Sequence, residues 1–378
     1  MRGPYTQRIA IWKRRIRTDE RPEAVHMTPR RVFLAAVLAA SLGTTGCSDP
    51  APPDPAAGIP KLDQRARALP PPETACAPVA PSAAGAPGAT VPRCALNLGR
   101  AVGALAVPPE GSPAIVSLIH AATASWTLPA MTYALAFDPL PAEQEARAIV
   151  ASATRDRALF AVGTDLLAYA PSSGKVAGRV AGPGGIIHDL AWTSDGAWIV
   201  VAAGGKAFVL DATGKVVRAL AVDGSALHVA VAADGTHTAV ANDVGAIRLL
   251  GTDDAAARTL TPSLQPVEGL AFVGDLLWVA GSDGTLRAFA TSSGDEVKRI
   301  DAGAALTRLA VSADGRRAAV AARDRVIRVY ALPAGAPVGS LTWHRAQITA
   351  LAWGADGTLL SGDGDGALAV WDPSATRP

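Results

Sequence analysis

A short triplet, Leu-Ala followed by an aromatic residue or Val, recurs along this 378-residue chain and constrains its fold more than any other feature. Successive copies begin 30, 55, 39, 41, 39 and 42 residues apart, and one of them is a Val-Ala-Val variant. A period of about 40 residues is typical of architectures in which one supersecondary unit is copied several times. The copies are Leu105-Ala106-Val107, Leu135-Ala136-Phe137, Leu190-Ala191-Trp192, Val229-Ala230-Val231, Leu270-Ala271-Phe272, Leu309-Ala310-Val311 and Leu351-Ala352-Trp353.

A second pattern gives an independent count of the units. Each unit is expected to carry a later strand with period-two alternation, called here the end strand. From Tyr169 on, the last residues of these strands are 41, 40, 39, 41 and 41 apart, and a first copy ending at Leu128 precedes Tyr169 by 41. The 55-residue interval after Leu135 is interpreted as an insertion before the second end strand. The end strands finish at Leu128, Tyr169, Leu210, Leu250, Phe289, Tyr330 and Trp371.

Both patterns give seven units, and Asp-Gly pairs between triplet and end strand supply tight turns in several of them. Each unit therefore has room for about four short strands, which is the content of one propeller blade. The sequence predicts an all-β, seven-bladed β-propeller of four-stranded blades over residues 89–378. Only 5% of the chain is aromatic, so small and β-branched side chains must form most of the core.

At these residues the chain resembles the WD-repeat β-propeller family, most closely in its last unit. His344 lies where that family has a Gly-His dipeptide, and Trp371-Asp372 is the dipeptide that names the family. The resemblance implies that His344, Ser361, Asp365 and Trp371 form the family's buried, hydrogen-bonded tetrad. The other units lack the His and the Trp, so we expect them to be held together mainly by packing.

The last blade is one outer strand short, because the chain reaches Pro378 soon after the final end strand. Residues 89–98 lie just before the first triplet and are expected to supply the missing strand, which would remove the free sheet edges at the seam. Cys94 belongs to this segment. We expect it to form a disulfide with Cys76 in an oxidising compartment, and two free thiols are the alternative.

The N-terminal 46 residues have the layout of an export signal. A basic stretch begins at Met27, an apolar run of 11 residues spans 32–42, and small residues lead to Cys47. This resembles a bacterial lipoprotein signal, which implies that Cys47 carries the lipid. An ordinary signal peptide and an uncleaved anchor are the alternatives. Translation is expected to start at Met27, or else residues 1–26 form a long basic region. The resemblance places the protein in the bacterial cell envelope, lipid-anchored and facing the periplasm or the exterior.

The segment between signal and propeller is predicted to be a disordered tether over 47–88, because residues 48–93 contain 12 prolines. Charge is distributed unevenly along the chain. Residues 1–46 hold nine Lys or Arg and three acids, which leaves 26 basic and 30 acidic residues for the remainder, a net charge of −4. No basic stripe is present in the body, which argues against nucleic acid as a partner.

Three functions remain open from the sequence. The first is a non-enzymatic scaffold that binds a protein of unknown identity through the loops where strands enter the central channel. The second is a quinoprotein-like, cofactor-binding propeller, and the third is an envelope-assembly lipoprotein. No catalytic motif, metal cluster or cofactor site stands out, so none is predicted. The loop residues proposed to contact a partner are His188, Ser225, Gln265, Glu268, Arg345 and Gln347.

Overall fold

A computed structural model describes residues 76–79, 90–141, 144–152, 155–251, 257–261 and 265–373. The export signal, Cys47 and most of the predicted tether lie outside these residues. All described residues belong to one compact unit within Gly58–Pro378.

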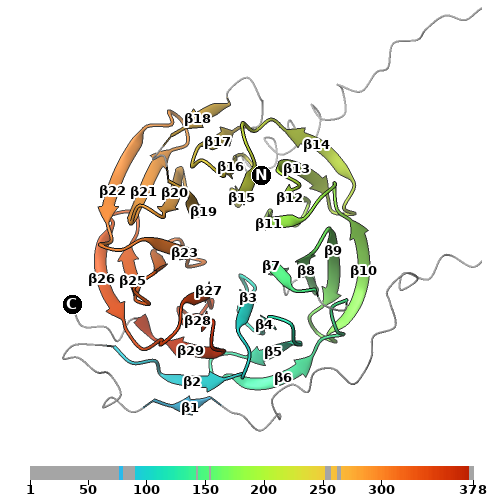
Figure 1. Ribbon diagram of the computed structural model, residues 1–378, viewed down its shortest axis with the longest axis vertical. Helices are drawn as coiled ribbons and strands as arrows, with labels where there is room; N and C mark the ends of the chain where they lie inside the picture. Colours follow the sequence, from blue (N-terminus) through green and yellow to red (C-terminus); the bar gives the residue numbers. More distant parts are fainter. Residues whose placement is uncertain are drawn as a thin grey trace, which may run out of the picture. The chain divides into compact units, whose positions relative to one another are not determined.

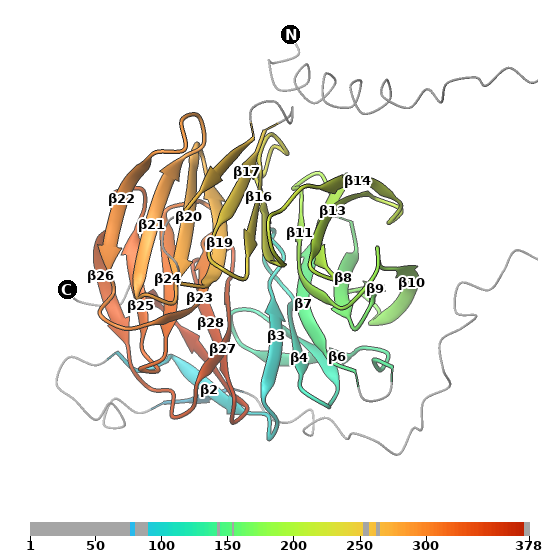
Figure 2. The ribbon, with the colours of Figure 1, turned by 45° about the horizontal axis from the view of Figure 1, so that its top comes forward.

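The described residues form seven antiparallel sheets arranged as blades around a central axis, so the predicted seven-bladed propeller is confirmed (Figure 1). Within blades 1 to 6 the strands follow the chain from the centre outward, as β19 to β22 do in Figures 1 and 2.

The blades are numbered in chain order. Blade 1 consists of β3 (Val102–Ala106), β4 (Ala114–Leu118), β5 (Thr123–Thr127) and β6 (Thr132–Ala136). Blade 2 consists of β7 (Ala146–Ser152), β8 (Arg157–Val162), β9 (Asp165–Ala170) and β10 (Lys175–Ala181). Blade 3 consists of β11 (Ile187–Trp192), β12 (Trp198–Ala203), β13 (Lys206–Asp211) and β14 (Val216–Leu220). Blade 4 consists of β15 (Ala226–Val231), β16 (Thr238–Asn242), β17 (Ile247–Leu250) and β18 (Arg258–Leu260). Blade 5 consists of β19 (Val267–Val273), β20 (Leu276–Gly281), β21 (Thr285–Ala290) and β22 (Glu296–Asp301). Blade 6 consists of β23 (Leu306–Val311), β24 (Arg317–Ala322), β25 (Ile327–Ala331) and β26 (Ala336–Leu341). Blade 7 consists of β27 (Ile348–Trp353), β28 (Leu359–Asp363), β29 (Ala367–Trp371), β2 (Cys94–Asn97) and β1 (Ala77–Pro78).

Blade 7 is built from both ends of the propeller sequence. Strand β2 pairs antiparallel with β29, with Cys94 opposite Val370 and Asn97 opposite Ala367. The segment 89–98 thus supplies the missing outer strand, as expected, and β1 adds a fifth strand outside it. The ring is closed by hydrogen bonds between strands rather than by contact of two free edges.

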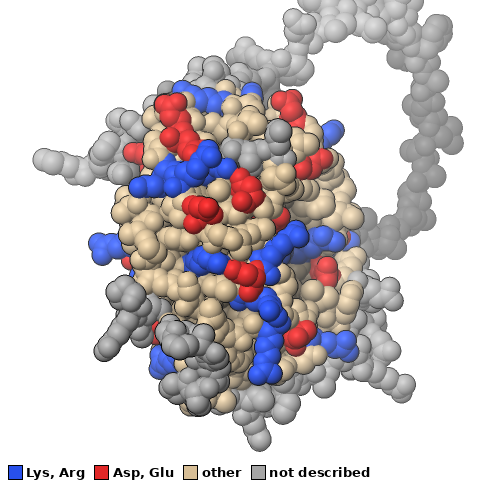
Figure 3. All heavy atoms as spheres, turned by 60° about the vertical axis from the view of Figure 1, so that its left-hand side comes forward, with Lys and Arg blue, Asp and Glu red and all other residues tan. Residues whose placement is uncertain are grey.

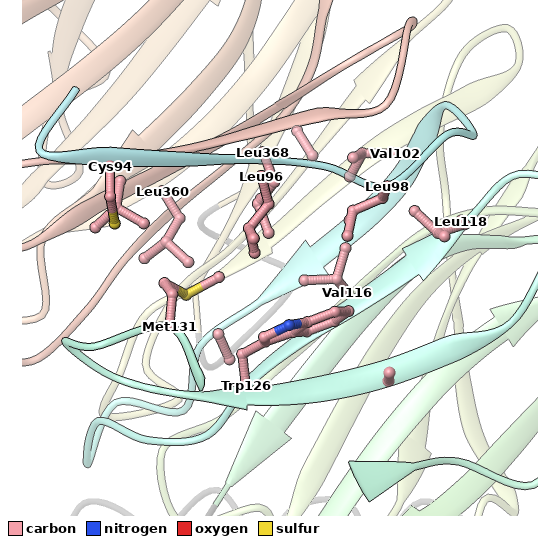
Figure 4. Packing of buried hydrophobic residues seen from close by; sticks show 14 residues of the cluster. Cys94, Leu96, Leu98, Val102, Val116, Leu118, Trp126, Met131, Leu360 and Leu368 are labelled. Carbon is pink, nitrogen blue, oxygen red and sulfur yellow. The ribbon is translucent and has the colours of Figure 1, made fainter. Parts of the chain in front are cut away.

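The core lies between the blades. Clusters of buried apolar side chains join neighbouring blades, and the cluster at the seam joins blade 7 to blade 1 (Figure 4). There Leu96 and Leu98 from the closing segment face Trp126 and Met131 of blade 1. The second strands are rich in small residues: Ala318, Ala319, Val320, Ala321 and Ala322 are all 0% exposed. Small side chains let the sheets approach closely, which explains how so few aromatics form the core.

The structure corrects the interpretation of the first two units. Leu135 and Ala136 lie in β6, the outer strand of blade 1, and do not start blade 2. The inner strand of blade 2 is β7, in which Ile149 lies opposite Phe160 as Leu190 lies opposite Val201 in blade 3. The count of seven was therefore right, but one triplet was assigned to the wrong strand.

The first end-strand residue is also corrected. Strand β5 ends at Thr127, and Trp126 is the residue opposite Tyr133 beside the register shift in β6. Leu210 has the same place beside the register shift in blade 3. Trp126, and not Leu128, is therefore the residue of blade 1 that corresponds to the end-strand residues of the other blades. The interval from Trp126 to Tyr169 differs from the intervals between the later end-strand residues, so spacing alone could not identify Trp126.

Candidate functional site: the start face of the ring

One end of the ring concentrates the residues that differ between blades. The inner strand of each blade starts at this end, opposite the last residue of the second strand, as Val267 lies opposite Gly281 in blade 5. The turns between second and third strands therefore lie at the same end. We call this end the start face.

Every inner strand has a register shift at its second residue, for example between Ile187 and Asp189 in blade 3. Such a bulge leaves one residue outside the pairing and re-aims its side chain. The backbone feature is repeated in all seven blades, whereas the side chain at this place is different in nearly every one. The bulge residues are Gly103, Arg147, His188, Leu227, Glu268, Thr307 and Thr349.

Polar side chains next to the bulges connect neighbouring blades. Asp189 Oδ2 lies 3.4 Å from His228 Nδ1 and accepts a hydrogen bond of 3.1 Å from the Val229 N–H, which joins blade 3 to blade 4. Thr349 Oγ1 donates to the Val102 carbonyl at 2.6 Å, which joins blade 7 to blade 1. These residues brace the ring as well as lining its start face.

Arg308 is a partly buried cation of this group. Its Nε donates to the Thr349 carbonyl at 2.6 Å and its Nη1 to the Thr307 carbonyl at 2.6 Å. Burial lowers the pKa of Arg308, while the charges of Glu268 and Asp189 raise it. Arg308 therefore joins blades 6 and 7 and balances two acids on other blades.

The six residues proposed to contact a partner all lie at the start face. His188 and Glu268 are bulge residues, and both are partly exposed. Ser225 and Gln347 directly precede inner strands, and Gln347 Nε2 donates to Thr307 Oγ1 at 3.3 Å and to the Ala322 carbonyl at 3.4 Å. Exposed residues in the connections before β19 and β27 complete the set, namely Gln265 and Arg345.

A buried polar network is present in blade 7, and it corrects one predicted member. His344 Nδ1 lies 2.7 Å from Asp363 Oδ2, and His344 Nε2 lies 2.6 Å from Ser361 Oγ. Trp371 Nε1 donates to the same Ser361 oxygen at 2.7 Å. The carboxylate is Asp363, at the end of β28; Asp365, which the sequence analysis placed here, is exposed in the following turn.

The position of Asp363 has a physical explanation. Its Oδ1 accepts hydrogen bonds from the N–H groups of Asp365 (3.0 Å) and Ala367 (2.9 Å), so one carboxylate anchors both the turn and His344. Burial opposes ionisation of Asp363, but the hydrogen bonds from His344 and these N–H groups outweigh it and hold its pKa below the usual value. Counting six residues back from Trp371 selected the turn residue instead of its anchor.

Ser361, His344 and Asp363 are hydrogen-bonded in the same order as the hydroxyl, imidazole and carboxylate of a catalytic triad. The burial of these three side chains nevertheless gives the network a structural role. Ser361 is 0% exposed, and its hydroxyl already interacts with both His344 and Trp371. A nucleophile needs access to substrate and a base that is free to take its proton. The network therefore holds the blade together and offers no reaction site.

The sequence analysis did not predict a second kind of polar interaction, an Asp–Arg ion pair in each of blades 5 and 6. Asp283 accepts hydrogen bonds from Arg287 Nη2 (2.6 Å) and Thr285 Oγ1 (2.7 Å), and Asp324 accepts one from Arg328 Nη2 (2.6 Å). Arg287 is 3% exposed, so this arginine is buried in the blade and does not belong to a solvated strand face. Burial opposes ionisation of Asp283, but the hydrogen bonds from Arg287 and Thr285 prevail and lower its pKa. The i,i+4 spacing of Asp and Arg was the available signal.

The expected disulfide is present between Cys76 and Cys94, with Cα atoms 5.4 Å apart. It links β1 to the closing strand β2, where Ala77 lies opposite Ala95. The bond therefore attaches the end of the predicted tether region to the seam of the ring.

The described part of the chain contains neither a metal-binding cluster nor a membrane-spanning helix. No group of three or more His, Cys, Asp or Glu residues there is placed to hold a metal ion. No helix in these same residues has the length and apolar character needed to span a membrane.

Comparison with known proteins agrees with this architecture. Residues 335–372 match the family described as "WD40: WD domain, G-beta repeat", a segment that runs from the outer strand of blade 6 through β29. A chain of the solved structure named "Crystal Structure of Mitotic Checkpoint Complex" superposes with a TM-score of 0.67 at 16% identity, covering 76% of this chain and 96% of that chain. No curated protein matches the chain. The chain is therefore a seven-bladed β-propeller, and its residues 335–372 are similar to one WD40 repeat.

Proposed function

We propose that this protein is a non-enzymatic scaffold that binds a protein partner through the start face of its propeller. The observation that carries the proposal is the contrast at the bulges. The backbone feature is the same in all seven blades, but its residue changes from Gly103 to Arg147, His188 and Glu268. A rigid repeated frame with variable side chains at one end suits specific recognition.

The comparisons support a binding role. Propellers that contain WD40 repeats typically serve as protein-interaction scaffolds, and the solved structure described above is by its name a complex. The start face also offers mixed polar side chains, which are typical of the rim of a non-obligate interface.

Site-specific photocrosslinking tests the binding face. A photoreactive residue in place of Gln265 lies on the start face, whereas one in place of Asp295 lies in the β21–β22 turn at the opposite end; both native residues are exposed. The proposal predicts that full-length protein in its native cells gives one stoichiometric adduct from position 265 and none from 295. Equal adducts from both positions, or none from either, would contradict it.

We further propose that the protein is exported to the bacterial envelope and anchored through a lipid on Cys47. The support is the sequence alone: a basic stretch, an apolar run of 11 residues and small residues before this cysteine. Metabolic labelling with an alkyne fatty acid should mark the wild type and not Cys47→Ser, and the variant should leave the membrane fraction. Labelling that persists in Cys47→Ser would exclude this anchor.

A further inference from the structure

Four exposed arginines form one arc on the start face over blades 6, 7 and 1. Arg323 and Arg325 lie in the turn between β24 and β25, Arg345 lies in the connection before β27, and Arg100 lies in the connection before β3. We call these four residues the arginine arc.

Hydrogen bonds and close approaches place the members of the arc next to one another. Arg325 Nη1 donates to the Arg345 carbonyl at 3.0 Å. The Gly364 N–H donates to the Gln347 carbonyl at 3.0 Å, so the β28–β29 turn lies beside the segment that follows Arg345. In the same turn, a Cβ on Gly366 would lie 2.5 Å from the Arg100 carbonyl oxygen. The arc therefore continues from blade 6 across blade 7 to blade 1.

The positive charge of the arc is poorly balanced. The same turns contain two exposed acids, Asp324 and Asp365, and Asp324 is already bound to Arg328. None of the ion pairs found among the described residues involves an arginine of the arc. The side of the ring that carries β22 and β26 differs, because basic and acidic side chains are interspersed there (Figure 3).

Arg325 also has an unfavourable backbone conformation. Its φ is 66°, in the left-handed region, and the residues at the same place in the turns of blades 4, 5 and 7 are Gly245, Gly284 and Gly366, with φ of 85°, 84° and 87°. An L-residue other than Gly costs roughly 1 kcal/mol in this region. A long cation at a place that favours Gly points to a use for its side chain, part of which is the hydrogen bond to the Arg345 carbonyl.

From this juxtaposition we propose that the arginine arc docks a short acidic segment of the protein partner. The inference rests on the proposed scaffold function and gives the chemistry of what is bound. A guanidinium group matches a carboxylate with two parallel hydrogen bonds, so Asp and Glu side chains suit a row of arginines. The rest of the start face carries exposed acids, including Asp223 and Asp243, which would repel a polyanion or an anionic membrane that covered the whole face.

A peptide-binding experiment tests the arc. The probe is a fluorescein-labelled peptide of roughly ten glutamates, titrated with the full-length chain by fluorescence anisotropy at low salt. Arg325→Glu with Arg345→Glu should weaken binding about tenfold or more, because two attractions become repulsions. The matched control is Arg316→Glu with Lys215→Glu, two exposed residues in turns at the opposite end, which should change affinity less than about twofold.

A third variant separates docking from a structural role. Arg325→Gly relieves the positive φ but loses the hydrogen bond to the Arg345 carbonyl, so the melting temperature should change little while peptide binding should still weaken. A lower melting temperature with unchanged binding would contradict the proposal. So would absence of binding by the wild type, equal losses in the two reversed-charge variants, or equally tight binding of a DNA duplex or of phosphatidylglycerol vesicles.

Failure of the arc and failure of the scaffold give different results. If the crosslink from position 265 persists in Arg325→Glu with Arg345→Glu, the scaffold stands and the arc is not its docking place. If no adduct forms even in the wild-type background, the scaffold itself is wrong.

Discussion

Blades 5 and 7 solve the same structural problem with different chemistry. In each, a carboxylate fixes the turn between the second and third strands. Blade 7 uses Asp363 at the end of β28, bound to His344 and to turn N–H groups. Blade 5 uses Asp283 inside the turn, bound to Thr285 and Arg287. One solution is a hydrogen-bonded network across the blade, and the other is a local ion pair.

The two blades also differ at the residue that lies opposite the start of the inner strand. By strand pairing, Gly281 of blade 5 corresponds to Asp363 of blade 7: both lie opposite the first residue of the inner strand. A Cβ at Gly281 would lie 2.5 Å from Asp283 Oδ1 and 3.5 Å from Arg287 Nη1. In blade 5 this glycine therefore lies directly against the ion pair, whereas Ala322 has the same place beside the Asp324–Arg328 pair of blade 6. Similar blades can therefore be held by unlike residues, and a blade that lacks the family tetrad does not have to be loosely held.

The largest effect should come from breaking the closure in blade 7. Deletion of residues 89–98 removes β2, exposes the edge of β29 and uncovers Trp126 and Leu368 in the seam core. We expect loss of the cooperative melt, whereas deletion variants outside the described ring, such as 58–70, should melt as the wild type. Circular dichroism and calorimetry measure this, and an unchanged melt after deletion of 89–98 would refute the seam.

Asp283→Ala should cause the next largest loss of stability, because it removes the closer ion-pair partner of the buried Arg287 guanidinium. Among the described residues, the ion-pair partner that remains is Glu296, whose Oε2 lies 3.5 Å from Arg287 Nε. Breaking a buried pair by removing one partner costs about 3–5 kcal/mol. Replacing both residues, in Asp283→Ala with Arg287→Leu, should recover more than half of the loss. Urea unfolding measures both values; a double variant no more stable than the single one would show that the pair is not the reason.

Removal of the disulfide should have a smaller effect that is confined to blade 7. The bond joins residues 18 apart in sequence, and closing a loop of this size stabilises by about 3 kcal/mol in the chain-entropy model. Cys76→Ser with Cys94→Ser should lower the free energy of unfolding by that order, and a reductant should do the same to the wild type. A reductant that also destabilises the double variant would point to another cause.

The smallest effect should come from Gly281→Ala, which places a methyl group against the Asp283–Arg287 pair of blade 5. Overpacking of this kind costs about 1–3 kcal/mol. Gly178→Ala in β10 is the matched control, because nothing lies within 4 Å of the added Cβ. Equal stability of the two variants in chemical denaturation would mean that the glycine is not needed for the ion pair.

Much of the fold followed from the sequence, because the later blades repeat their apolar pattern at nearly constant spacing. Blade 2 escaped that pattern since Ala148-Ile149-Val150 lacks the Leu-Ala pair, while Leu135-Ala136 in the outer strand β6 has it. The anchoring role of Asp363 and the burial of Arg287 could not be read from spacing. Both features depend on which residue lies opposite which in the paired strands. A shift of two residues along a strand preserves its inward and outward alternation but changes which carboxylate meets the partner side chain.

Native-state hydrogen exchange of the intact protein tests most directly the claim that the two ends of the sequence close one cooperative ring. The amide of Arg93, bonded to the Val370 carbonyl at 2.7 Å, and the β2–β29 amides should exchange with the same opening free energy as those of β20 and β21 in blade 5. Opening of β2 at a free energy several kcal/mol below that of blade 5 would contradict closure and show a seam that frays independently of the ring.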